Sequence, residues 1–192
     1  MSLDPLRWGL IPRWCKDPTG GRKPINAKCE TVHQLLTFRD AYRSRRCIVP
    51  VDGFFEWKAI KSQRAKQPYA IAMKEGAPFW IAGIWENWKE PASGEWIRTF
   101  AIITTDANEL VAEIHDRMPL ILAPGDYIGW LSDEPDPRDL MRPFAPLRIC
   151  MADYRERRTD GARARWFISG FRSDPYTVYR RGTHAHCSRQ SC

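Results

Sequence analysis

Two segments of the sequence carry polar residues whose types and spacing suit chemistry on an electrophile. In the first, an amide and a cation, Asn26 and Lys28, stand one residue apart beside a turn. In the second, the carboxyl group of Glu56 follows the turn sequence Asp52-Gly53 and stands between two aromatic residues. A carboxyl group that loses hydration has a raised pKa, which suits it to proton transfer. The alternative is a hairpin in which Glu56 faces water.

A third segment with chemical potential is His115-Asp116-Arg117, which stands shortly before Pro119. A proline disfavours helix in the residue before it, so a predicted helix ends here. A His beside a carboxylate and a guanidinium can exchange protons and bind an anion. It can equally cap a helix on an exposed loop. Thr104 and Thr105 end the preceding strand, where their hydroxyls either face a cleft or cap the next helix.

Most of the elements that must position these residues are predicted to be short strands. Alternating or continuous apolar runs predict strands over residues 7–11, 47–51, 54–59, 69–73, 79–85, 96–104, 120–122 and 146–151. Helices are predicted over residues 32–44, 106–115 and 124–131. Strands outnumber helices and are joined as hairpins, so the predicted fold class is α+β with a mainly antiparallel, curved sheet.

The helix predicted over residues 32–44 has two contrasting sides. Thr31 is its predicted N-cap. The apolar side contains Leu35, Leu36, Phe38 and Tyr42, and the basic side contains Arg39, Arg43, Arg45 and Arg46.

Composition and charge favour one globular domain with an anionic partner. The 192 residues include 43% hydrophobic residues and nine Trp, which argues against global disorder. The formal net charge of +7 and the pI near 9.3 make nucleic acid the first candidate partner. Basic and aromatic residues together suit single-stranded nucleic acid, through phosphate neutralisation and base stacking.

Several other classes of protein are disfavoured. No apolar run is long enough to span a membrane, and residues 1–5 lack the pattern of a secretory signal. The six Cys do not have the regular spacing of a disulfide framework, so we expect reduced thiols in a cytoplasmic protein. We also expect the protein to be a monomer. Common nucleotide-binding and hydrolase motifs are absent. His184, His186, Cys187 and Cys192 have metal-ligand spacing but no apolar frame, so no metal or cofactor is expected.

Taken in order, the motifs of this sequence resemble the SRAP family (SOS-response-associated peptidase, abasic-site-processing proteins). The matching pieces are Trp8-Gly9-Leu10-Ile11-Pro12, Trp14, Ile25-Asn26-Ala27-Lys28, Glu30-Thr31, Arg46-Cys47, Pro50, Gly53-Phe54-Phe55-Glu56-Trp57, Gln67-Pro68-Tyr69, Phe79-Trp80, Ala82-Gly83-Ile84-Trp85, Thr104-Thr105, Ala107-Asn108 and Ile114-His115-Asp116-Arg117-Met118-Pro119. They cover residues 7 to 151. The resemblance implies a barrel-like SRAP domain over residues 1–154, truncated at its N-terminus, followed by a divergent tail over residues 155–192.

The resemblance also implies a function and roles for particular residues. SRAP proteins bind single-stranded DNA at an abasic site and form a covalent DNA–protein link. Asn26 would orient the N-terminal residue or the sugar, and Glu56 and His115 would move protons. Trp14, Lys28, Thr104 and Arg117 would line the DNA channel.

The sequence departs from the family pattern at the nucleophile. The family uses a Cys directly after the initiator Met, whose amine and thiol close a thiazolidine, whereas position 2 here is Ser. Cys15 and Cys29 cannot supply the α-amine of such a ring. Lys28 stands where the family usually has Arg. A Lys ammonium cannot make the bidentate phosphate contacts that an Arg guanidinium makes. Two expectations follow, a truncated SRAP enzyme with impaired cross-linking or a non-catalytic remnant that binds single-stranded DNA.

Overall fold

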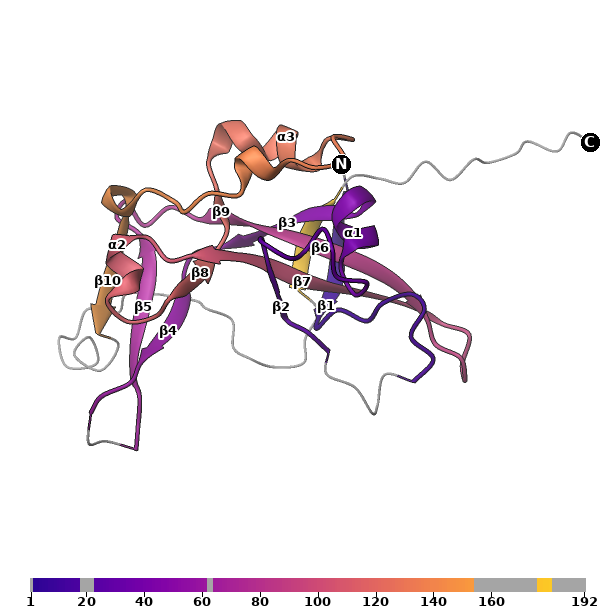
Figure 1. Ribbon diagram of the computed structural model, residues 1–192, viewed down its shortest axis with the longest axis horizontal. Helices are drawn as coiled ribbons and strands as arrows, with labels where there is room; N and C mark the ends of the chain where they lie inside the picture. The colour runs from indigo at the N-terminus through magenta and orange to yellow at the C-terminus, as the bar shows by residue number, and fades with distance from the viewer. Residues whose placement is uncertain (1, 18–22, 62–63, 154–175, 181–192) are drawn as a thin grey trace, which may run out of the picture.

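Strands dominate the computed structural model, which describes residues 2–17, 23–61, 64–153 and 176–180. The strands are β1 (Ser2–Trp8), β2 (Asn26–Lys28), β3 (Arg46–Val51), β4 (Phe54–Lys58), β5 (Gln67–Met73), β6 (Phe79–Lys89), β7 (Trp96–Asp106), β8 (Arg117–Pro119), β9 (Ile121–Leu122), β10 (Ile149–Asp153) and β11 (Tyr176–Arg180). The helices are α1 (Arg39–Ser44), α2 (Glu109–Ala112) and α3 (Tyr127–Leu131), with 3-10 turns η1 (Pro124–Asp126), η2 (Arg138–Leu140) and η3 (Pro146–Arg148). This confirms an α+β fold with few, short helices (Figure 1).

The long strand β7 organises the larger sheet. On one edge it pairs with β6 and, further along, with β8, both antiparallel. On the other edge it pairs with β1 and then β2, both parallel. The larger sheet is therefore mixed, although most of its pairings are antiparallel. A separate antiparallel sheet contains β10, β5 and β4 in that order.

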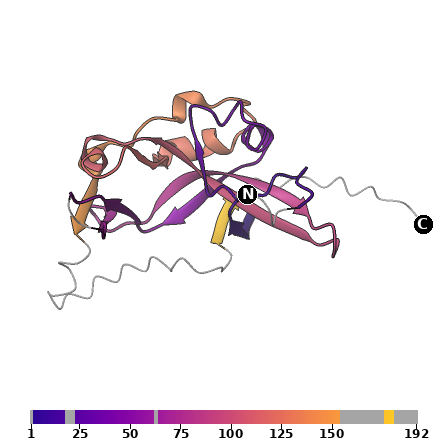
Figure 2. The ribbon, with the colours of Figure 1, turned by 60° about the horizontal axis from the view of Figure 1, so that its bottom comes forward.

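The larger sheet is strongly curved, and Figure 2 shows its long strands crossing at an angle. β11 joins β1 to β3, and β6 pairs with both β3 and β7. Two of these junctions are narrow, since β1 pairs with β7, and β11 with β3, through only two residue pairs each. The pairings of β7, β1, β11, β3 and β6 run full circle, so the sheet is barrel-like as expected. The two narrow junctions keep it from being a regular closed barrel within the described ranges.

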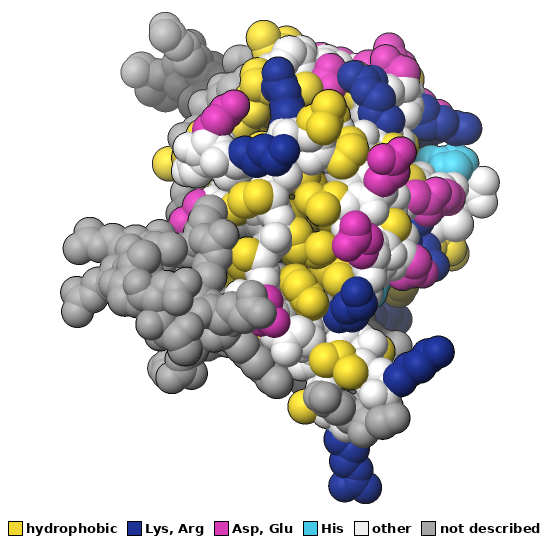
Figure 3. Space-filling model, turned by 90° about the vertical axis from the view of Figure 1, so that its left-hand side faces the viewer, with side chains coloured by type: hydrophobic (Ala, Val, Ile, Leu, Met, Phe, Trp, Pro, Cys, Tyr) yellow, Lys and Arg dark blue, Asp and Glu magenta, His cyan; other side chains and the backbone are white. Residues whose placement is uncertain are grey.

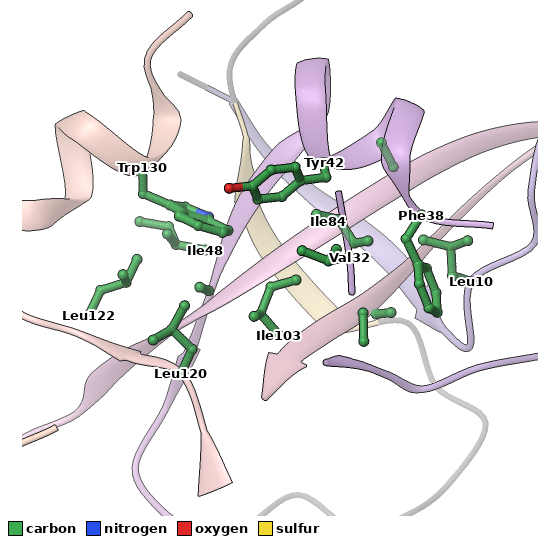
Figure 4. Packing of buried hydrophobic residues seen from close by; sticks show 14 of the residues in the cluster. Leu10, Val32, Phe38, Tyr42, Ile48, Ile84, Ile103, Leu120, Leu122 and Trp130 are labelled. Atoms are coloured by element: carbon green, nitrogen blue, oxygen red, sulfur yellow. The ribbon is translucent and has the colours of Figure 1, made fainter. Parts of the chain in front are cut away.

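Helices α1 and α3 cover one face of the larger sheet, where one of two core clusters lies (Figures 1 and 2). Figure 4 shows Tyr42 of α1 and Trp130 of α3 packing over Ile48, Ile84 and Ile103 of the strands. Trp130 is fully buried, and its indole Nε1 donates to the carbonyl of Cys47 at 2.9 Å. Burial of these large side chains supplies most of the driving force for docking the helices.

The helix predicted over residues 32–44 is wrong for its first half, because only α1 is helical. Residues 29–38 form successive turns, with Val32 N–H donating to Lys28 and Phe38 N–H to Leu35. Val32 and Phe38 are both buried. On a continuous helix these two side chains would diverge by about 120° around the axis. The turns let both reach the core, and no side chain caps α1.

The predicted basic side of that helix is also wrong for two of its four arginines. Arg46 begins β3 and is 5% exposed. Arg45 lies at the end of α1 and pairs with Glu86, with Nη2 and Oε1 2.6 Å apart. Only Arg39 and Arg43 are exposed cations on α1 itself.

Two other boundaries differ from the prediction for local reasons. The first strand is β1 rather than residues 7–11, because Gly9 has a φ of 111° and ends the extended run. Asp106 ends β7 rather than beginning a helix. Asn108 instead caps α2, its side-chain oxygen accepting from the Val111 N–H at 3.0 Å.

Gly83 stands where β6 crosses closely over its neighbours, and we expect Gly83→Ala to destabilise the fold. A Cβ at this position would lie 2.9 Å from Cys47 Sγ and 3.2 Å from the carbonyl oxygen of Ala101. Overpacking of this kind costs about 1–3 kcal/mol. Thermal unfolding should show a lower Tm for Gly83→Ala. The matched control is Gly125→Ala, where nothing lies within 4 Å of the added Cβ. Equal Tm values for the two variants would contradict the close approach.

Candidate functional site

Glu56 lies on β4, opposite Tyr69 of β5. Side chains alternate along a strand, so Glu56 shares a face with Phe54 and Lys58. Its sequence neighbours Phe55 and Trp57 lie on the opposite face, where their rings are 6.3 Å apart. The aromatic residues beside Glu56 in the sequence are therefore not those on its own face of the sheet.

The carboxyl group of Glu56 is half-buried, and this burial raises its pKa. The charges of His115 and Lys66 act in the opposite direction and lower that pKa, while Asp116 raises it. The imidazole of His115 and the carboxyl of Glu56 are thus close enough to interact electrostatically, although they are 59 positions apart in the sequence. A raised carboxyl pKa beside a His is the arrangement that general acid–base chemistry requires.

His115 lies one turn beyond α2. Its N–H donates to the carbonyl of Val111 at 3.0 Å, and its side chain is 42% exposed. The Nδ1 atom lies 3.0 Å from the backbone nitrogen of Arg117 and 3.3 Å from a carboxylate oxygen of Asp116. These contacts direct Nδ1 toward its own loop, which leaves Nε2 as the ring nitrogen free to meet another group.

A cleft of about 540 Å³ opens beside these residues. Its walls come from the end of β4, the end of β7, α2 and the loop after α2. The lining residues are Lys58, Ala59, Asp106, Ala107, Ala112, Glu113, Ile114, His115 and Asp116. The cleft thus brings together a His, a Lys and three carboxylates, with Glu56 on the same face of β4 as Lys58.

Arg117 is held by acidic partners at the start of β8. It donates two hydrogen bonds to Glu30, from Nη1 to Oε1 at 2.6 Å and from Nη2 to Oε2 at 3.0 Å. It also contacts Asp106, and its Nη2 donates to the carbonyl of Thr104 at 2.8 Å. The guanidinium lowers the pKa of Glu30 to about 2. Two carboxylates therefore already neutralise Arg117, so a phosphate at this position would have to compete with them.

Asn26, Lys28 and Thr104 lie on neighbouring strands beside Arg117. The register places Asn26 opposite Ile102, Lys28 opposite Thr104, and Arg117 opposite Asp106. Asn26 and Lys28 are exposed, whereas Thr104 is 9% exposed. Four residues along β7 correspond to roughly 13 Å, so Asn26 stands about that far from the level of Arg117.

Trp14 is separated from these residues along the sheet. It is 58% exposed. Its neighbour Cys15 accepts a hydrogen bond from Trp88, which pairs with Ile97 near the start of β7. Trp14 therefore lies toward the end of β7 that is remote from His115.

The described cysteines offer little nucleophilic chemistry. Cys15, Cys29 and Cys150 are free thiols, and Cys47 is buried in the core. Burial raises the pKa of the Cys29 thiol, which keeps it protonated. No cluster of three or more potential metal ligands occurs among the residues that the structure describes. The tail residues His184, His186, Cys187 and Cys192 lie outside the described residues. No helix in the described ranges is long and apolar enough to cross a membrane.

Sequence comparison places this chain in a known family. The model of the SRAP family, described as SOS response associated peptidase, matches residues 1–154. The chain belongs to the SRAP family. Its relatives include the abasic site processing protein YoqW of Bacillus subtilis (strain 168), 43% identical over 146 residues, which are 74% of this chain and 64% of YoqW. Another is the abasic site processing protein HMCES of Xenopus tropicalis, 30% identical over 168 residues, 76% of this chain and 50% of that protein.

Solved structures agree with the assignment of this chain to the SRAP fold. A crystal structure of a protein from Bacteroides thetaiotaomicron has a TM-score of 0.72 and 35% identity, covering 77% of this chain and 67% of that one. The SRAP chain spans less than two thirds of the length of the curated relatives named above.

Sequence reasoning missed the role of Glu30 and the positions of Asp106 and Lys58. Glu30 was part of a matched motif, but its partner Arg117 is 87 positions away. Lys58 and Asp106 end strands of different sheets. The only available signal was their charge, which by itself is typical of exposed surface positions.

Proposed function

We propose that this SRAP chain binds single-stranded DNA at abasic sites, with Glu56 and His115 moving protons in the reaction at the sugar aldehyde. The observation that carries the proposal is a half-buried carboxyl with a raised pKa, within electrostatic reach of a partly exposed imidazole beside a cleft. Its relatives YoqW and HMCES are both named abasic site processing proteins, which supports this substrate.

The two groups suit the steps by which an amine adds to an aldehyde. Attack by the amine requires a base to remove a proton, and loss of water from the carbinolamine requires an acid. Glu56 with a raised pKa retains a proton at a higher pH than an exposed carboxyl. His115 offers Nε2 as a second group that can exchange a proton with the reacting atoms.

The face of β2, β7 and β8 supports the binding of the DNA strand. Asn26 and Lys28 are exposed along it, and the Lys28 ammonium can neutralise a phosphate. Arg117 contributes by shaping the site, because it ties β8 to Glu30 of the segment after β2. Contact between Arg117 and a phosphate would require exchange of its carboxylate partners.

The covalent step is the part of the family chemistry that this chain, as printed, is least suited to perform. Residue 2 is Ser, and it pairs with Arg180 within β1 and β11. A Ser hydroxyl cannot close a thiazolidine, and its pKa keeps it a poor nucleophile. We therefore propose that Ser2 closes no thiazolidine ring with abasic DNA and that no stable link forms through this residue.

Two measurements test this proposal. Fluorescence anisotropy should show tighter binding to a single-stranded oligonucleotide with a stable abasic analogue than to the corresponding duplex, with affinity falling steeply as salt rises. A denaturing gel with a natural abasic site should show no adduct that survives denaturation. Absent or salt-independent binding would refute the DNA-binding proposal. A heat-stable adduct would refute the proposed loss of cross-linking.

The second candidate function is a module that binds single-stranded DNA without chemistry, favoured by Ser at position 2. It predicts the same binding but no conversion of the abasic strand under any condition. Strand scission or a transient adduct that depends on Glu56 would decide in favour of the first proposal.

A further inference from the structure

We propose that the hairpin joining β4 to β5 is a phosphate-binding arm, which holds the DNA strand on one side of the lesion. The cations of this arm are Lys58, Lys61, Arg64 and Lys66. This inference rests on the proposed function, because it names where the flanking nucleotides of the same strand lie.

The arm carries concentrated and unneutralised positive charge. Residues 58–66 contain four Lys or Arg and no Asp or Glu. Lys61, Arg64 and Lys66 are exposed. No ion pair links these four cations to a carboxylate of the described residues, in contrast to several surface arginines of the same chain. Those paired arginines are Arg39, Arg98, Arg138 and Arg142. The charge of the arm is therefore available to a partner.

The base of the arm adjoins the candidate site. Lys58 ends β4 and lines the cleft together with His115. Lys66 immediately precedes β5, and its charge reaches the carboxyl of Glu56. Figure 1 shows the described residues after β4 and before β5 extending away from the body. Dark-blue basic side chains project at the lower end of the face in Figure 3, the end toward which the hairpin points.

The charged residues that line the cleft come from different elements, and the sign of their charges favours one path for the DNA strand. The wall from α2 and the following loop carries Glu113 and Asp116, and the Asp116 side chain is 89% exposed. These carboxylates repel phosphates. Among the described residues, Lys58 at the end of β4 is the one Lys or Arg that lines the cleft, and the chain leads from it directly to the arm. The third lining carboxylate, Asp106, is paired with Arg117. A strand whose lesion enters the cleft therefore continues over the arm rather than over α2.

The test removes two cations from the outer part of the arm. The double variant Lys61→Ser/Arg64→Ser is compared with Lys74→Ser, which removes an exposed cation from the opposite end of β5. The probe is a single-stranded oligonucleotide with a stable abasic analogue, titrated at several salt concentrations. Each lost phosphate contact should lower the slope of log K against log salt by about 0.7 in magnitude, so the double variant should lose about 1.4. Lys74→Ser should leave the slope unchanged.

A second pair of probes tests whether the arm binds the DNA on only one side of the lesion. One oligonucleotide extends only 5′ of the abasic analogue, and the other extends only 3′. The double variant should lose affinity, by about tenfold at low salt, for only one of them. The proposed phosphate-binding role of the arm would be overturned by any of three results. These are an unchanged slope of log K against log salt, equal losses of affinity for both probes, or a loss of affinity seen only with duplex DNA or RNA. Failure of the unmodified chain to bind either probe would instead count against the proposed function. Thermal unfolding of each variant checks that the hairpin change leaves the fold intact.

Discussion

Glu56→Gln is expected to raise the thermal stability at neutral pH and to lower any conversion of abasic DNA by about 10²–10⁴-fold. The loss of conversion follows from removing the group that would donate and accept protons. Binding to a stable abasic analogue should be unchanged within a few-fold, because Glu56 is not a phosphate-binding group. Conversion is measured as adduct or strand scission on a denaturing gel.

The expected gain in stability follows from the sign of the pKa shift. Burial raises the pKa of Glu56 in the folded chain above its value in the unfolded chain. At a pH above both values the ionised carboxylate therefore disfavours folding, and this cost disappears as the pH falls below the unfolded value. Gln removes the cost at neutral pH and changes little in acid. Each kcal/mol recovered is worth about 2–4 °C of Tm in a chain of this size.

The control for Glu56 is Glu75→Gln, at an exposed carboxylate in the turn after β5. It should change neither the Tm nor conversion. If Glu56→Gln has a lower Tm than the unmodified chain at neutral pH, burial of the ionised Glu56 carboxylate does not destabilise the fold as we expect. If the unmodified chain converts no abasic DNA, the non-catalytic alternative stands, and the stability comparison still tests the environment of Glu56.

Arg46→Met is expected to lower the free energy of unfolding by about 3–5 kcal/mol, the largest stability effect that we anticipate for this chain. Arg46 is 5% exposed, and its guanidinium donates to backbone carbonyls from two parts of the chain. It donates to Trp130 at 2.5 Å, Tyr42 at 2.7 Å, Ser132 at 2.7 Å and Glu134 at 2.6 Å.

These hydrogen bonds fasten the segment after α3 to α1 and β3. The guanidinium carbon also lies 5.9 Å from the centre of the Tyr42 ring and 5.8 Å from that of Trp130. Met would fill part of the volume but satisfy none of the carbonyls, each of which costs about 1–3 kcal/mol when buried without a partner. Replacement by Lys keeps the charge but loses the planar set of donors, so Arg46→Lys should show a smaller loss.

Denaturant unfolding of the three proteins measures these differences. The matched control is Arg39→Met, at a position on α1 whose side chain is 51% exposed. It should lie within about 0.5 kcal/mol of the unmodified chain. A similar midpoint for Arg46→Met and Arg39→Met would show that the network around Arg46 contributes little. If Arg46→Met does not fold, the Arg46→Lys variant still gives the comparison.

Local pattern was sufficient wherever a side chain's environment depends on its near neighbours in sequence. The apolar run of residues 79–85 predicted a buried strand, and β6 contains it. Asp52-Gly53 predicted a turn, and the chain does turn between β3 and β4. The predicted hairpin is wrong, however, because β3 and β4 belong to different sheets and do not pair with each other. The position of Pro119 predicted that a helix would end near His115, and α2 ends slightly earlier, at Ala112. These features placed Glu56 on a strand and His115 beyond a helix end, and the family resemblance was carried by the same segments.

Charge was a poor guide wherever pairing partners are distant in sequence. Arg45 and Arg46 were predicted as exposed residues on a helix, yet one pairs with Glu86 and the other is buried among carbonyls. Arg117 was predicted to line the DNA channel, and that role stays a prediction, but its pairing with Glu30 and Asp106 could not be read from the sequence. In each case the partner comes from another strand or loop. The periodicity of the sequence within one element does not reveal such a contact.

The sequence by itself determined the strand-rich α+β class, the family, and the residue types available for proton transfer and DNA binding. Only the tertiary structure decided that β1 and β2 lie parallel to β7, and that β11, from residues 176–180, inserts between β1 and β3. It also decided that Glu56 and His115 lie within electrostatic reach, beside a cleft lined by Lys58 and three carboxylates. Periodicity records which side of its own element a residue faces, whereas the choice of neighbouring element depends on packing between segments far apart in the chain.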